Sequence, residues 1–66
     1  MIQLTAVQHY FEARNLYKIG KYQVAIYDYG KAILLEPNNY KFYAKRGDTY
    51  HLLLQYKGQF VIIPKL

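Results

Sequence analysis

Two pairs of histidine and carboxylate residues are the groups in this sequence whose types and spacing best suit chemistry. His9 lies three residues before Glu12, and Asp48 lies three residues before His51. Side chains three apart project from the same side of an α-helix, and imidazole and carboxylate groups are common zinc ligands. The two pairs would supply four metal ligands if the fold brought them together. Whether it does depends on the elements that carry them.

Other kinds of catalytic chemistry are not indicated. Nucleophilic catalysis needs a base held against its nucleophile and oriented by a third group, and the sequence spells out no such triad. The chain has no cysteine, which excludes disulfides, thiolate metal sites and cysteine nucleophiles. Its four glycines, at positions 20, 30, 47 and 58, are dispersed and form no phosphate-binding loop. We therefore predict that the protein is not an enzyme, has no catalytic residues and binds no cofactor.

Length and composition fit one small folded domain, which we assign to residues 1–66. Apolar residues make up 53% of the chain and charged residues 20%, so the chain is too apolar for intrinsic disorder. It contains no apolar run near the roughly 18 residues that span a bilayer, so we predict no membrane span. The amino terminus does not resemble a secretory signal. Together with the absence of cysteine, this favours an intracellular, cytoplasmic location.

Positive charge is concentrated in the second half of the chain. Nine lysine and arginine residues against four aspartate and glutamate residues give a net charge of +5. Residues 1–39 carry four basic and three acidic residues, a net +1, whereas residues 40–66 carry five basic residues and one acidic residue, a net +4. This asymmetry favours an acidic partner, and it does not by itself distinguish acidic peptides, nucleic acid and anionic lipid.

Apolar residues recur with helical spacing in three segments that are separated by two breaks. Gly20 ends the first segment, since glycine adopts the left-handed conformation that commonly terminates a helix. The second break is the run EPNN at residues 36–39, where proline disfavours helix in the residue before it and asparagine is a good N-cap. The sequence predicts an all-α fold with helices at about 5–19, 22–35 and 38–54.

Individual residues indicate where the first helix begins and which sides of the helices pack together. Thr5 and Gln8 have the spacing of a capping box at the start of the first helix. Asp28 falls outside the apolar stripe of the second helix, on one of its other sides. Small residues are expected to let the helices approach closely. These are Ala13, Ala25, Ala32 and Gly47.

The chain also matches itself at a spacing of 34 residues, which aligns Ala13 with Gly47. With this period it resembles the tetratricopeptide repeat family, whose pattern has small residues in both helices, a glycine and an aromatic residue near the turn, and a closing proline. The residues at these places are Ala13, Gly20, Tyr22, Ala25, Tyr29, Ala32 and Pro37. The resemblance implies antiparallel helix-turn-helix hairpins of an α-solenoid. Residues 6–39 would form one complete repeat, and residues 40–66 a partial second repeat and tail.

The second repeat departs from the family pattern near its turn. Leu54 replaces the turn glycine, and Pro64 falls where the second helix should continue. We therefore expect about three helices, with residues 56–66 as a short helical or extended tail. Repeat modules bury their faces against neighbours, so the open ends of this chain require a cover. We hypothesise that the apolar residues 60–63 fold back as a cap or mediate self-association.

The resemblance also implies where a ligand would bind, because the first and third helices would line the concave side of the solenoid. The residues at these places are Tyr10, Arg14, Tyr17, Lys18, Lys41, Lys45, Asp48 and His51. Tyrosine and arginine are frequent binding hot spots, and a cationic groove suits an extended acidic peptide. The alternative is that this side is simply a solvated helix face. Other tyrosines are expected to pack in the core. They are Tyr22, Tyr29, Tyr43 and Tyr50.

On the same implied arrangement, the two histidine–carboxylate pairs separate. His9 and Glu12 would lie toward the packing side of the first helix, whereas Asp48 and His51 would point toward the groove. Because the pairs do not converge, we predict no metal site.

Three functions are consistent with these observations. We expect an interaction module that binds a peptide or a partner helix, or that forms part of a longer scaffold. The first alternative is binding of RNA or other nucleic acid, because the second half is basic and exposed aromatic rings can stack on bases. The second alternative is a structural unit that self-associates.

Overall fold

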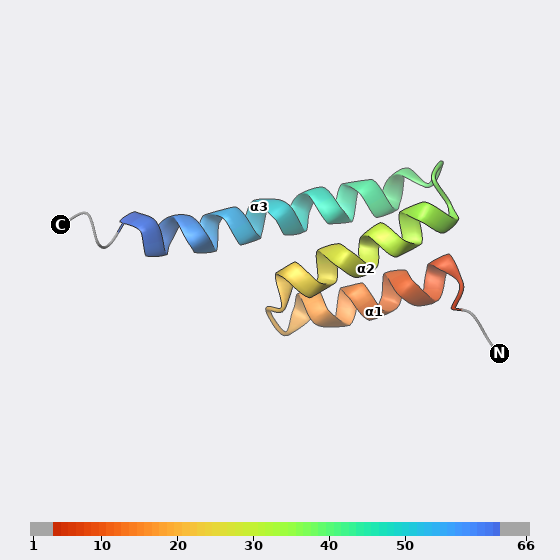
Figure 1. The fold of residues 1–66 in the computed structure, drawn as a ribbon, viewed down its shortest axis with the longest axis horizontal. Coiled ribbons are helices and arrows are strands. Elements are labelled where there is room, and N and C mark those ends of the chain that lie inside the picture. Colours follow the sequence, from red (N-terminus) through yellow and green to blue (C-terminus); the bar gives the residue numbers. More distant parts are fainter. Residues whose placement is uncertain (1–3, 63–66) are drawn as a thin grey trace.

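The computed structural model describes the backbone of residues 4–62 and the side chains of residues 4–56. Over this range the chain forms three α-helices and no strand. They are α1 (Ala6–Lys18), α2 (Tyr22–Leu35) and α3 (Tyr40–Ile62). Figure 1 shows that α1 and α2 form an antiparallel hairpin, and that α3 returns along α2 and continues past its end. The predicted all-α fold of helical hairpins is confirmed.

Capping and turn contacts explain where the first hairpin begins and turns. The backbone N–H of Thr5 donates to Gln8 Oε1 at 2.7 Å, and the N–H of Gln8 donates to Thr5 Oγ1 at 3.2 Å, which is the expected capping box. At the other end of α1, Gly20 has a φ of 82°, and the N–H of Lys21 donates to the carbonyl of Leu16 at 2.9 Å. Glycine takes this left-handed conformation without steric cost, so it closes the turn between α1 and α2.

The second turn is held by Asn39, which caps α3. Its Oδ1 accepts from the N–H of Lys41 at 3.1 Å, and its Nδ2 donates to Glu36 Oε1 at 3.3 Å. The hydroxyl of Tyr43 donates to the carbonyl of Pro37 at 3.0 Å and secures the turn from α3. Because Asn39 serves as the cap, α3 begins at Tyr40, slightly later than the expected residue 38.

The third helix is much longer than its predicted end near residue 54, since it runs to Ile62. Leu54 stands where the repeat pattern has its turn glycine, so nothing at that point favours a left-handed residue. Residues 60–62 continue α3 away from the hairpin (Figure 1), and the expectation that they fold back as a cap is wrong. Ile63 and Pro64 lie outside the described residues, and self-association stays a hypothesis.

Two small clusters of buried residues form the core, and both are centred on α2. One joins Ala13 of α1 to Ala25 and Tyr29 of α2, and the other contains Ala6, Ala32, Ile33 and Phe42. Tyr10 packs against both clusters. Buried alanines therefore let the helices approach closely, as expected.

Three residues of α3 that were expected to pack are instead exposed. Tyr43 is 43% exposed and Tyr50 is 46% exposed. Gly47 is also exposed, and a Cβ at this position would meet nothing within 4 Å. The physical reason is that α3 does not turn at Leu54, so no fourth helix within residues 4–62 covers this side of α3.

Candidate functional site

The eight residues predicted to line a binding surface lie on α1 and α3, and we call them the α1–α3 face. They are Tyr10, Arg14, Tyr17, Lys18, Lys41, Lys45, Asp48 and His51. The set contains four lysine or arginine side chains and one carboxylate, so the face is basic. Tyr10, Tyr17 and Lys45 are half-buried, and the other five members are exposed. No hydrogen bond or ion pair within the described part of the chain joins these five side chains to one another.

Lys45 and Tyr17 are brought together from different helices. The Nζ atom of Lys45 lies 6.0 Å from the centroid of the Tyr17 ring, at the limit of a cation–π contact. The ring of Tyr22 is also close to that of Tyr17, with its centroid 5.7 Å away. Thr49, one turn after Lys45, is fully buried and donates from its hydroxyl to the carbonyl of Lys45 at 2.7 Å. The face therefore presents a cation beside an aromatic ring at the junction of α1 and α3.

Tyr10 contributes more to the core than to the open face. Its ring centroid lies 5.2 Å from that of Phe42 on α3 and 5.8 Å from that of Tyr29 on α2. The ring of Phe11 is 5.6 Å away in an edge-to-face arrangement. Aromatic rings at these separations attract one another beyond the effect of their burial. Tyr10 thus links all three helices, which leaves Arg14, Tyr17 and Lys45 as the accessible centre of the α1–α3 face.

Tyr29 lies in the core next to this face, and its side chain is completely buried. Burial raises the pKa of Tyr29, and the neighbouring Tyr10 and Tyr17 add to the increase, while Thr49 and Arg14 oppose it. Tyr17 also packs against the core cluster that contains Tyr29. The Tyr29 hydroxyl is buried and has no hydrogen-bond partner among the described residues.

One cluster of possible metal ligands occurs among the described residues, and it does not combine the two histidine–carboxylate pairs of the sequence. His9 and Glu12 lie close to Asp28 of α2, with ligand atoms within 4.8 Å of one another, and they do not meet Asp48 or His51. Nδ1 of His9 is buried without a hydrogen-bond partner. Structural zinc sites usually have four protein ligands, and three are present here.

Asp28 is more buried than its position outside the apolar stripe of α2 suggests. It is only 8% exposed, although the apolar stripe of α2 suggested that it lies on another side of the helix. The reason is that α2 is packed by α1 on one side and by α3 on the other, so that few of its faces remain open. The carboxylate of Asp28 is 3.8 Å from Nζ of Lys31, which already supplies a compensating positive charge. We assign no metal ion to this cluster.

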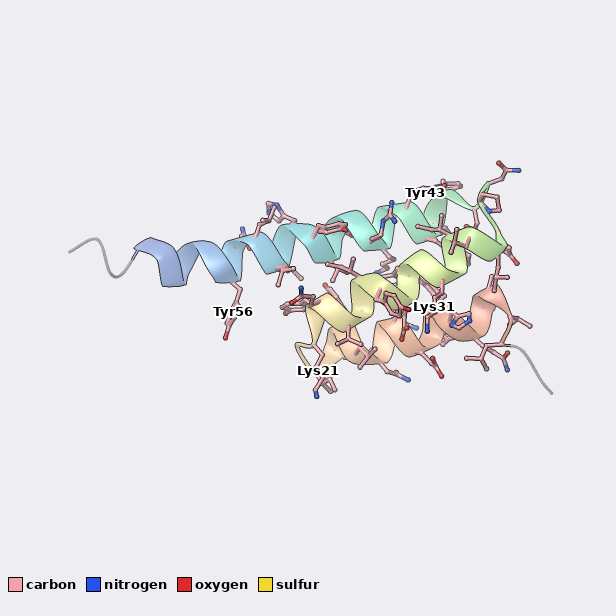
Figure 2. The ribbon with its side chains drawn as sticks, in the orientation of Figure 1. Lys21, Lys31, Tyr43 and Tyr56 are labelled. Carbon is pink, nitrogen blue, oxygen red and sulfur yellow. The ribbon has the colours of Figure 1, made fainter. Side chains whose placement is uncertain are left out.

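A hollow that the sequence did not predict lies between α2 and α3. It is an open depression with a volume of about 670 Å³. Its lining residues are Gln23, Ile26, Tyr27, Gly30, Lys31, Ile33, Leu34, Arg46, Tyr50 and Leu53. A second hollow of about 540 Å³ shares Gln23 and Leu53 with it and continues to Tyr22 and Tyr56. We call the two hollows together the α2–α3 trough. Figure 2 shows Tyr56 projecting from the overhanging part of α3 toward the level of the α1–α2 turn, where Lys21 lies.

The sequence does contain a signal for this trough, which the search for a single apolar stripe missed. Apolar residues occupy nearly every side of α2, including positions that prove to be exposed. These are Val24, Tyr27, Leu34 and Leu35. A helix that is apolar all round is normally covered all round. Counting apolar residues off the stripe would therefore have indicated a further partner surface on α2.

Comparison with known proteins identifies the repeat. A family model described as a TPR repeat matches residues 13–53, which is most of the described chain. No curated protein and no solved structure matches the sequence. Within residues 4–62, no helix has the length and hydrophobicity needed to cross a membrane.

Proposed function

The chain belongs to the tetratricopeptide repeat family, whose members are generally non-catalytic modules for protein–protein interaction or scaffolding, and we propose that it binds an extended acidic peptide on the α1–α3 face. The observation that carries this proposal is the contact between Lys45 and Tyr17, which places a cation and an aromatic ring from two helices on one accessible surface.

The charge of the face supports an acidic ligand. Arg14, Lys18 and Lys41 are exposed, and Asp48 is the single carboxylate of the set. Unpaired cations on a surface attract carboxylates at long range and then pair with them at contact. The ring of Tyr17 would provide apolar contact area for side chains between the acidic residues of the peptide.

Fluorescence anisotropy with a defined probe tests this proposal. The probe is a fluorescein-labelled peptide of alternating glutamate and proline, which stays extended, and its twin has glutamine in place of glutamate. We expect the protein to bind the glutamate peptide and to bind the glutamine peptide at least about tenfold more weakly, because the attraction depends on charge. Binding should weaken as salt is added, since exposed charges are screened.

Charge-reversal variants locate the site. Arg14→Glu and Lys45→Glu should each weaken binding at least about tenfold. Lys21→Glu is the matched control, because Lys21 is an exposed lysine in the α1–α2 turn and outside the α1–α3 face. If Lys21→Glu weakens binding as much as Lys45→Glu, only the net charge matters and the proposed site is wrong. A parallel titration with single-stranded oligouridylate addresses the nucleic-acid alternative: tighter binding of the oligonucleotide than of the peptide would favour it.

A further inference from the structure

The α2–α3 trough is a second surface that the proposed peptide site does not use. It lies between two helices that pack side by side, and its larger hollow is an open depression with a volume of about 670 Å³. Several of its lining residues are large, apolar and open to solvent: Leu34 is 82% exposed, Tyr27 is 66% exposed and Tyr50 is 46% exposed. Contiguous apolar patches of this kind on a small protein mark interaction sites.

Gly30 indicates how closely a partner can approach. It lies inside α2 and lines the trough, and a Cβ added to it would meet nothing within 4 Å. A glycine inside a helix is unfavourable relative to alanine, and no described neighbour of Gly30 needs the space that the missing side chain leaves. The backbone at Gly30 is therefore open to close contact from outside the described chain.

The shape of the trough suits a helix. It runs between α2 and α3, and grooves between packed helices accept the side-chain ridges of another helix. α2 has 14 residues, which corresponds to a length of about 21 Å. A partner helix of about four turns would therefore cover it.

The charges along the trough select the chemistry of the partner. Lys31 and Arg46 line its larger hollow, Lys21 lines the smaller one, and none of the lining residues is acidic. Lys31 already lies 3.8 Å from the carboxylate of Asp28, so the uncompensated positive charge of the trough comes from Arg46 and Lys21. Arg46 lies over the ring of Tyr43 at 5.6 Å, and Lys31 lies over the ring of Tyr27 at 4.7 Å, so both cations stand beside apolar surface. An amphipathic helix with aspartate or glutamate beside its apolar stripe would match this arrangement.

A second copy of this chain is a poorer match. The sequence of α1 has two basic residues and one acidic residue, α2 has one of each, and α3 has four basic residues and one acidic residue. Each helix is thus neutral or positive. We propose that the α2–α3 trough is a docking site for an acidic amphipathic helix of a different protein, whose backbone passes over Gly30.

The test uses the full chain and a labelled helical peptide of the same length as α2. The peptide carries leucine at helical spacing with glutamate on either side, and its twin has lysine in place of glutamate. We expect the glutamate peptide to bind at least tenfold more tightly than the lysine twin. Gly30→Gln should reduce this binding at least tenfold while leaving the fold intact, because the added side chain enters open space.

Three further variants test whether the helical peptide binds specifically in the trough. Gly47→Gln makes the same substitution inside α3 but outside the trough, where a Cβ also meets nothing within 4 Å, and should leave helix binding unchanged. Arg46→Glu should reverse the preference between the two peptides. Lys45→Glu, which disrupts the proposed peptide site on the α1–α3 face, should leave helix binding within twofold of the original. The two proposals can therefore fail separately.

Three outcomes would overturn the docking proposal. The first is equal binding of the glutamate and lysine peptides, and the second is equal binding by the original chain and Gly30→Gln. The third comes from light scattering over a concentration series: a dimer that Gly30→Gln dissociates and Gly47→Gln preserves would assign the trough to a second copy of the chain.

Discussion

Replacement of Tyr29 by phenylalanine is expected to stabilise the protein, because it removes a buried polar atom that lacks a full hydrogen bond. The side chain of Tyr29 is completely buried, and its hydroxyl has no such partner within residues 4–56. In the unfolded chain the same hydroxyl bonds to water. Phenylalanine retains the ring, which lies 5.8 Å from the ring of Tyr10, so the aromatic packing is preserved.

The magnitude follows from the cost of burying an unsatisfied polar group, about 1–3 kcal/mol. The side chain of Thr49 lies near enough to favour the ionised form of Tyr29, so some polar interaction remains and the lower end of this range applies. A gain of about 1 kcal/mol in the free energy of unfolding raises the Tm of so small a domain by roughly 4–8 °C. Thermal and urea unfolding followed by far-ultraviolet circular dichroism measure it. Tyr40→Phe, at a position 75% exposed, is the matched control and should change nothing.

The effect should depend on pH in a defined direction. Burial raises the pKa of Tyr29 above the unfolded value near 10. The neutral phenol therefore contributes stability that is fully present below pH about 10 and is lost as the pH rises through the folded pKa, because the unfolded chain ionises first. The advantage of Tyr29→Phe over the original chain should widen in that alkaline range. A lower Tm for Tyr29→Phe at neutral pH would refute this reasoning, and so would an advantage that does not widen at alkaline pH.

Three further substitutions test the helices that carry the binding surfaces and the turn that joins α1 to α2. Gly47→Ala should stabilise α3 by about 1 kcal/mol, since its Cβ enters open space. Gly20→Ala should destabilise the α1–α2 turn by about 1–2 kcal/mol, because φ at Gly20 is 82°; equal effects at the two positions in urea unfolding would contradict the left-handed turn. Thr5→Ala removes the capping box of α1 and should cost about 1 kcal/mol. An unchanged urea midpoint for this last variant would show that the start of α1 contributes little to stability.

The fold was largely predictable because its signals are local. The capping box of Thr5 and Gln8, the left-handed glycine at position 20 and the asparagine cap of α3 each depend on a few neighbouring residues. The end of α3 was not predictable in the same way. Leu54 stands where the repeat pattern has a helix-ending glycine, and no glycine or proline follows it at once. The helix therefore continues to Ile62.

The candidate surfaces were less predictable, because they depend on which sides of each helix are covered. Tyr10 was assigned to an open face from its position in the repeat, yet it contacts Phe42 and packs in the core. Asp28 was placed off the packed side, yet it is buried, since α2 is the central helix. The trough depends on how α3 packs beside α2 and continues past Leu54, which involves residues far apart in the sequence.

The length of α3 connects stability with binding in this protein. α3 contributes Lys45 to the α1–α3 face and Arg46 to the α2–α3 trough, so one helix serves both surfaces. Its contacts with the hairpin come chiefly through Phe42 and the half of the helix beside α2, whereas the remainder extends beyond it (Figure 1). A partner that covers the trough buries Leu34 and Tyr27 as well, which adds to a core made mostly of alanines. Because such a partner binds only the folded chain, the acidic helical peptide should raise the Tm as its concentration increases. Binding of a partner helix to the open side of α2 would therefore raise the free energy of unfolding of the chain.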